Sequence, residues 1–233
     1  MDAEEYRDGT GVGAAVSRVR ARIAAAAARS GRRAEEITLV AVTKGVSLER
    51  IREVVAAGVA DLGESRVQEA APKVAALGAA VRWHLVGHLQ RNKAARAAAL
   101  FEVIHSVDSA ALLAALSRRA SRPLDVLLQV KLTEEGGRHG VPPEALAALA
   151  RQAVGLPGVR VAGLMTIAPP ARDPEAARAV FRRLRELRGE LGRLIGPLPH
   201  LSMGMSDDFE VAVEEGATMV RIGRAIFGPR VVT

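Results

Sequence analysis

The sequence predicts an α/β fold, a single (β/α)8 TIM barrel with an extra N-terminal helix. Short, almost wholly apolar runs alternate with segments of helical periodicity along the chain. Such runs are typical of parallel strands that are buried on both faces. This alternation is compatible with an open, doubly wound sheet or a closed barrel, and eight strand-helix units after a leading helix favour the barrel.

The extra helix is predicted from Val12 to Arg29. Apolar residues recur at helical spacing within an Ala-rich stretch, at Val16, Val19 and Ile23. Gly31 follows as the stop signal. We expect the polar residues 1–11 before this helix to form a flexible tail.

The first strand is predicted from Ile37 to Val42, and its helix from Leu48 to Gly58. The other seven strand-like runs are ADLG, RWHLVG, FEVIHSV, LDVLLQV, VRVAGLMT, PHLSMG and ATMVRIG. After the first six of these runs we expect helices to begin near Ser65, Gln90, Ala110, Pro142, Asp173 and Asp207.

Two of these helix starts carry capping signals. Ser65 with Gln68 three residues later forms a capping-box pattern. Asp173 is a good N-cap residue, and Pro174 suits the first helical position.

The composition predicts one globular domain that covers residues 1–233. Hydrophobic residues make up 49% of the chain but aromatic residues only 3%, so the core must be built from Ala, Val, Leu and Ile. The chain has no cysteine, which excludes disulfides, thiolate metal sites and cysteine nucleophiles. Its polar, acidic start lacks the features of a signal peptide, and no apolar run is long enough to span a membrane. We expect a soluble, cytoplasmic protein.

The chain is strongly basic, with a formal net charge of +7 and a pI near 10.8. Such a charge raises nucleic acid as a partner. The arginines, however, are dispersed over predicted helix faces, with almost no aromatic residues for base stacking. A solvated basic surface that favours small anionic ligands is the better interpretation, and we expect no specific nucleic-acid partner.

The chemistry of such a barrel lies where strands end and helices begin. Lys44 follows the first strand at this position. The chain has 33 basic residues, of which only four are lysines: Lys44, Lys73, Lys93 and Lys131. Partial desolvation at the barrel mouth would make the Lys44 amine a nucleophile. A lysine that merely extends its stem over apolar surface would occupy the same position.

The last two strands lead into a possible phosphate site. Barrels of this class often bind phosphate after strands seven and eight, at glycine amides and a short helix N-terminus. Ser206 and Gly223 fit that description. Each also fits an ordinary structural role, as an N-cap serine and a turn glycine.

The remaining motifs do not indicate a metal or a nucleotide. His84 and His88 are four residues apart but lie across a strand and its loop, so they do not share a helix face. The glycine-containing segments lack the spacing of dinucleotide or P-loop motifs. We expect no metal site.

The sequence resembles the YggS/PROSC family, the pyridoxal phosphate homeostasis proteins. The resemblance spans almost the whole chain and lies in the blocks LVAVTK, GESRVQEA, WHLVGHLQRNK, GLMTI and LSMGMSDDFEVAVEEGATMVRIGRAIFG. It implies a single barrel domain like the N-terminal domain of alanine racemase. The resemblance also implies that this chain binds pyridoxal 5′-phosphate without an assigned turnover.

The resemblance also assigns residues. Lys44 matches the lysine that holds the cofactor as a Schiff base, and Arg221 matches the arginine that faces the pyridine nitrogen. Ser206, Gly223 and the backbone of Arg224 match the phosphate-binding stretch. Met165 matches a residue beside the ring. Ser65 stands where the family usually has asparagine, and His88 lies at a variable position with no assigned role.

The implied function is intracellular homeostasis of pyridoxal phosphate, with possible transfer to apoenzymes that depend on it, and no catalytic residues are assigned. The alternative is an amino acid racemase that uses the same cofactor. Racemisation on the alanine racemase pattern needs a second acid/base opposite the lysine, a tyrosine brought by a second domain. The only tyrosine here is Tyr6, in the expected tail. A third interpretation is nonspecific nucleic-acid binding. We expect a monomer.

Overall fold

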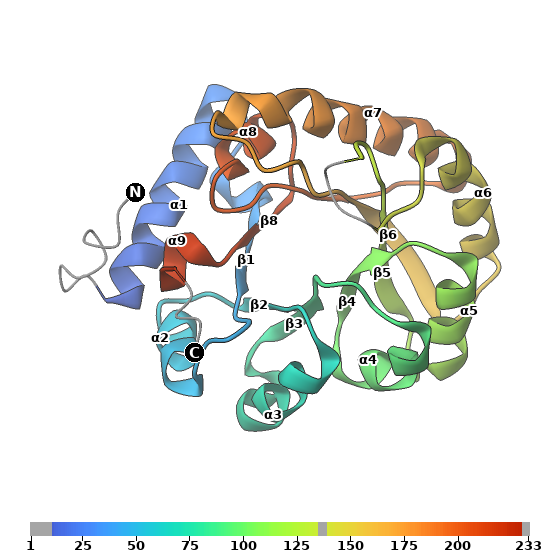
Figure 1. Ribbon diagram of the computed structural model, residues 1–233, viewed down its shortest axis with the longest axis horizontal. Helices are drawn as coiled ribbons and strands as arrows, with labels where there is room; N and C mark the ends of the chain where they lie inside the picture. The colour runs from blue at the N-terminus through green and yellow to red at the C-terminus, as the bar shows by residue number, and fades with distance from the viewer. Residues whose placement is uncertain (1–10, 135–138, 230–233) are drawn as a thin grey trace.

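The computed structural model describes residues 11–134 and 139–229, and its centre is a closed barrel of parallel strands (Figure 1). The strands are β1 (Thr38–Val42), β2 (Asp61–Glu64), β3 (Arg82–Leu85), β4 (Val103–Val107), β5 (Leu124–Gln129), β6 (Val159–Met165), β7 (His200–Ser202) and β8 (Met219–Ile222). They pair in chain order, and β8 closes the barrel against β1. The predicted (β/α)8 barrel is confirmed.

The helices surround the barrel (Figure 1). They are α1 (Val12–Arg29), α2 (Leu48–Ala56), α3 (Val67–Leu77), α4 (Ala94–Leu100), α5 (Ala110–Arg119), α6 (Pro143–Val154), α7 (Arg178–Ile195), α8 (Phe209–Glu214) and α9 (Arg224–Phe227). Short 3-10 turns cover Ala34–Glu36, Gly78–Ala80, Arg91–Lys93 and Pro174–Ala177. None of the helices in the described ranges is long and apolar enough to cross a membrane.

The extra helix α1 has the predicted bounds and packs against α2, α8 and α9. Its buried stripe includes Val16, Val19 and Ile23, as the periodicity predicts. Arg22 also forms an ion pair with Glu210 of α8, with a distance of 2.8 Å between the charged atoms. Residues 1–10, most of the expected flexible tail, lie outside the described residues.

Three predicted helix starts differ from the structure, whereas the starts predicted near Ala110 and Pro142 are confirmed. The predicted capping box at Ser65 is wrong: α3 begins at Val67 after Arg66, and no side chain caps it. The helix predicted near Gln90 opens with the Arg91–Lys93 turn, and the helix predicted from Asp207 begins two residues later. Asp173 caps as predicted, because its carboxylate accepts a hydrogen bond from the Glu175 amide at 3.0 Å.

Two apolar layers hold the fold together. The larger layer lies between the barrel and its helices and consists mainly of Ala, Val, Leu and Ile, as the composition predicts. The smaller layer fills the barrel interior and comprises Val40, Val103, Leu127, Ala162, Met165 and Met219. Because successive strand residues point to opposite faces, β1, β4, β5, β6 and β8 contribute to both layers.

Candidate functional site

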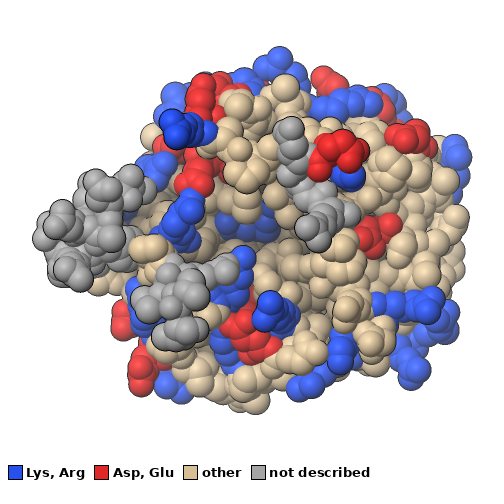
Figure 2. Space-filling view, in the orientation of Figure 1, with Lys and Arg blue, Asp and Glu red and all other residues tan. Residues whose placement is uncertain are grey.

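A cavity of about 520 Å³ opens at the carboxyl ends of the strands. Its lining includes Lys44 after β1, Ser206 after β7, Arg221 on β8, and Gly223 and Arg224 at the start of α9. Figure 2 shows a hollow in this face of the molecule, with Lys and Arg side chains in and around it. The volume falls within the range of about 300–1,000 Å³ that is typical of small-molecule sites.

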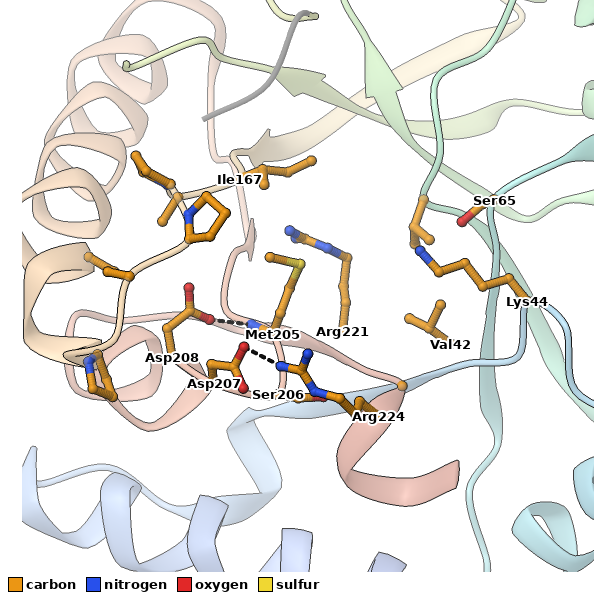
Figure 3. Close-up of a pocket in the computed structure, with 18 of the residues that line it drawn as sticks. Val42, Lys44, Ser65, Ile167, Met205, Ser206, Asp207, Asp208, Arg221 and Arg224 are labelled. Carbon is orange, nitrogen blue, oxygen red and sulfur yellow. Dashed lines mark hydrogen bonds and ion pairs between the residues drawn. The ribbon is translucent and has the colours of Figure 1, made fainter. Parts of the chain in front are cut away.

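Lys44 is partly buried and lines this cavity. Figure 3 shows its side chain extending from the end of β1 into the open space that Arg221 also lines. The structure thus brings the predicted nucleophile and the predicted pyridine partner into one cavity.

A buried cluster fixes the backbone on both sides of Lys44. Lys73 of α3 donates a hydrogen bond of 2.7 Å to the carbonyl oxygen of Thr43. The same amine lies 2.7 Å from Glu64 and 2.9 Å from Glu69. The amide of Gly45 in turn donates to Glu69 at 2.5 Å. Lys44 therefore stands between two anchored peptide groups.

The cluster contains one cation, Lys73, and two carboxylates, Glu64 and Glu69. Glu64 is fully buried, and burial raises the pKa of its carboxyl group, while hydrogen bonds from Lys73 and Thr43 act in the opposite direction. The Thr43 hydroxyl donates to Glu64 at 2.5 Å. Sequence reasoning did not assign this cluster. The available signals were the scarcity of lysine and the spacing of Glu69 and Lys73, four residues apart on one helix.

Arg221 is 5% exposed and is held by two hydrogen bonds. Its Nη1 donates to Ser202 Oγ at 2.6 Å, and its Nη2 donates to the carbonyl oxygen of Thr166 at 2.9 Å. Burial lowers the pKa of Arg221 to about 10, against the opposing charge of Asp208. The guanidinium therefore keeps its charge at neutral pH and has further N–H groups for a ligand in the cavity.

Ser206 lies between β7 and α8 and contacts the start of α9. Its hydroxyl accepts a hydrogen bond of 3.1 Å from the amide of Ala225. The hydroxyl therefore holds the first turn of α9, which lies further along the chain. The N-cap residue of α8 is Asp208, so Ser206 does not have the N-cap role that the sequence also allowed. Gly223 is the N-cap residue of α9, and the Arg224 side chain pairs with Asp207 (Figure 3).

Met165 has a different environment from the other five assigned residues. It ends β6, is fully buried, and packs in the inner apolar layer of the barrel. Its neighbour in the cavity wall is Ile167, which packs against the same layer. The structure therefore brings Lys44, Ser206, Arg221, Gly223 and Arg224 together in the cavity lining, whereas Met165 lies in the inner apolar layer and outside that lining.

Ser65 also lines the cavity, at a point where two chain segments meet closely. A Cβ atom on Gly87 would lie 2.2 Å from the carbonyl oxygen of Ser65, so only glycine fits there. This close approach brings the loops after β2 and β3 together at the cavity wall. Ser65 is thus a wall residue instead of the predicted helix cap.

One cluster of possible metal ligands lies within the described ranges, formed by His88, Asp108 and His139. The two imidazole rings are stacked, with centroids 3.6 Å apart and planes inclined by 8°. Nitrogen lone pairs lie in the ring planes, so those of stacked rings do not converge on one ion. We assign no metal to this cluster.

Comparison with known proteins places the chain in a family. Residues 15–231 match the family model for the N-terminal domain of alanine racemase. The pyridoxal phosphate homeostasis protein of Aquifex aeolicus is 46% identical over 220 residues, which cover 92% of this chain and 96% of that protein. The chain belongs to the pyridoxal phosphate homeostasis protein family. The Escherichia coli K12 member is 39% identical, over 92% of this chain and 95% of that one.

Solved structures agree with this family assignment. The family member PipY of Synechococcus elongatus, whose structure has pyridoxal phosphate bound, superposes with a TM-score of 0.82 and is 38% identical. That match covers 93% of this chain and all of PipY. Alanine racemase of Corynebacterium glutamicum has a TM-score of 0.66 at 18% identity, and only 62% of that enzyme is covered. This second likeness shows a shared fold alone.

Proposed function

We propose that this chain binds pyridoxal 5′-phosphate as a Schiff base on Lys44 and serves in the homeostasis of that cofactor. The observation that carries the proposal is the convergence of Lys44, Arg221 and the Ser206–Gly223–Arg224 residues on one cavity. The relatives named as homeostasis proteins and the PipY structure with its bound cofactor support it.

The residues of the cavity suit the parts of this cofactor. When bound, pyridoxal phosphate supplies an aldehyde that condenses with a primary amine, for which Lys44 is the lysine in the cavity lining. The hydroxyl of Ser206 and the chain at Gly223 and Arg224 offer hydrogen bonds to a phosphate group. In our proposal Met165 supports the ring from below, through the inner layer, without lining the cavity.

Arg221 suits a role in holding the cofactor more than one in catalysis. A guanidinium facing the pyridine nitrogen donates a hydrogen bond and keeps that nitrogen unprotonated, which weakens the ring as an electron sink. Racemisation also needs a second acid/base across from the lysine. The single tyrosine of the chain, Tyr6, lies outside the described residues. We therefore propose binding and release of the cofactor by a cytoplasmic monomer, with delivery to apoenzymes.

The proposal is tested by loading the protein with pyridoxal phosphate and removing the free cofactor. The loaded protein is mixed with an apoenzyme that needs pyridoxal phosphate, and the activity of that enzyme is followed together with the visible absorbance of the loaded protein. We expect the absorbance to fall as the enzyme activity rises. We also expect no racemisation when amino acids are added to the loaded protein alone.

Two lysine variants control this experiment. Lys44→Ala should abolish the visible absorbance, whereas Lys131→Ala should keep it, because Lys131 pairs with Glu134 and does not line the cavity. Retention of absorbance and delivery by Lys44→Ala would overturn the proposed anchor. Sustained turnover of an amino acid by the loaded wild-type protein would overturn the proposal of a protein without catalysis.

A further inference from the structure

A continuous path of hydrogen-bonded polar side chains crosses the barrel interior and ends at Arg221. Its members lie on the inward faces of five strands: Asp61 on β2, His84 on β3, His105 on β4, Ser202 on β7 and Arg221 on β8. Along this path His84 Nε2 lies 2.8 Å from Asp61 Oδ1, and His84 Nδ1 lies 2.9 Å from His105 Nε2. His105 Nδ1 lies 2.8 Å from Ser202 Oγ. The Arg221–Ser202 bond closes it at 2.6 Å.

The polar path from Asp61 to Arg221 runs from one end of the barrel to the other. Asp61 is the first residue of its strand, and its side chain is 20% exposed. His84, His105 and Ser202 are fully buried, and Arg221 reaches the cavity. Buried polar groups of this kind are costly unless each one is hydrogen-bonded. A complete polar path thus lies beside the inner apolar layer of the barrel.

Each group in this path donates a hydrogen bond to the next group in the direction of Asp61. Arg221 can only donate, so Ser202 Oγ accepts from it. The Asp61 carboxylate accepts from His84 Nε2. With both imidazoles neutral, His84 Nδ1 accepts from His105 Nε2, and His105 Nδ1 accepts from the Ser202 hydroxyl. Burial lowers the pKa of both histidines, which agrees with this assignment.

We propose that Ser202, His105, His84 and Asp61 are positioning residues that orient the Arg221 guanidinium toward the pyridine nitrogen of the cofactor. Every proton of the path points away from the cavity toward Asp61, so Ser202 stays an acceptor for Arg221. The carbonyl oxygen of Thr166 fixes the other arm of the guanidinium. This inference rests on the proposed function, and it adds residues that line no part of the cavity.

The test combines nitrogen NMR of the histidines with cofactor affinity. In wild-type protein the Nδ1 atoms of His84 and His105 should show the shifts of unprotonated nitrogen. Saturation with pyridoxal phosphate should move the His105 signals, because a ligand on Arg221 polarises its bond to Ser202. His200, at the start of β7 and outside the path, should not move, and His200→Gln identifies its signals.

A pair of serine variants measures the effect on binding. Ser202→Ala should weaken binding of pyridoxal phosphate by about tenfold, as expected for loss of a hydrogen bond to a charged group. The matched control is Ser106→Ala, since Ser106 is equally buried and its hydroxyl donates to the Gly87 carbonyl oxygen instead of joining the path. Its affinity should stay within about twofold of the wild type.

Each outcome decides the inference. Unchanged His105 signals on saturation, or an affinity of Ser202→Ala equal to that of wild type, would overturn the positioning role while leaving the proposed function intact. Failure of the wild-type protein to bind the cofactor would overturn the proposed function and this inference with it. If Ser202→Ala does not fold, the wild-type spectra decide alone.

Discussion

The amine of Lys73 lies 2.7 Å from the carbonyl oxygen of Thr43, the residue before Lys44. This bond connects helix α3 to the end of strand β1 beneath the cavity. Because the Lys73 side chain is only 9% exposed and the Glu64 side chain is not exposed at all, their ion pair is well shielded from water. The Lys73 cluster, which fixes the backbone beside Lys44, is therefore part of the folded core.

Substitution of Lys73 by methionine should be strongly destabilising. Lys73→Met leaves Glu64 buried without its cation, and loss of one partner from a buried ion pair typically costs about 3–5 kcal/mol. The free energy of unfolding, measured in urea, checks this value. Lys93→Met, at a half-exposed lysine, is the control and should change stability by no more than about 0.5 kcal/mol. Similar losses in the two variants would show that the Lys73 cluster is not a structural anchor.

The stability of the protein should fall in mild acid. Burial lowers the pKa values of His84, His105 and His200 in the folded state. The unfolded chain therefore takes up more protons below about pH 6.5, the ordinary histidine value. The stabilisation is fully present above that pH and is lost as the pH falls toward the folded-state values. Each histidine contributes a slope of up to about 1.4 kcal/mol per pH unit.

The histidine contribution can be separated from that of the carboxylates. Burial raises the pKa values of Glu64 and Asp208, and these groups act in the opposite direction as the pH falls. Both carboxylates remain in His200→Gln, so the difference in slope from wild type belongs to His200. Urea unfolding between about pH 7.5 and about pH 5 should give a shallower slope for the variant. Identical slopes would contradict the assignment.

Two glycine substitutions should have opposite effects. Gly87→Ala places a Cβ atom 2.2 Å from the Ser65 carbonyl oxygen and should destabilise by about 1–3 kcal/mol, because two backbone segments must separate. Gly189→Ala lies in helix α7, where nothing is within 4 Å of the new Cβ atom, and should stabilise by about 0.4–1 kcal/mol. Thermal unfolding of the two variants gives the comparison. A stabilising Gly87→Ala would show that the loops at the cavity wall do not need this close approach.

Much of the architecture could be predicted from the sequence because it depends on local order. Eight apolar runs with helical segments between them define the strand-helix units, and the carboxyl ends of parallel strands share one rim. That reasoning predicted Lys44 at the cavity without any knowledge of side-chain contacts. It misread Ser65, since a serine followed by glutamine three residues later fits both a cap and a loop position.

The two buried polar systems could not be predicted in the same way. Lys73 meets Thr43 only after α3 packs against the barrel. The path from Asp61 to Arg221 depends on which face of each strand points inward and on five strands closing around one axis. No single segment contains either pattern. The sequence showed histidines and serines in the strands, and the closed barrel is what joins them.

The central claim is that Lys44 carries the cofactor, and chemical trapping tests it most directly. The protein is loaded with pyridoxal phosphate, reduced with borohydride, digested, and mapped by mass spectrometry to find the modified lysine. The chain has four lysines, so the assignment is unambiguous. We expect one modified peptide that carries the label on Lys44, in wild type and in Lys131→Ala alike. A label on Lys73, Lys93 or Lys131, or no label in protein saturated with the cofactor, would contradict the account.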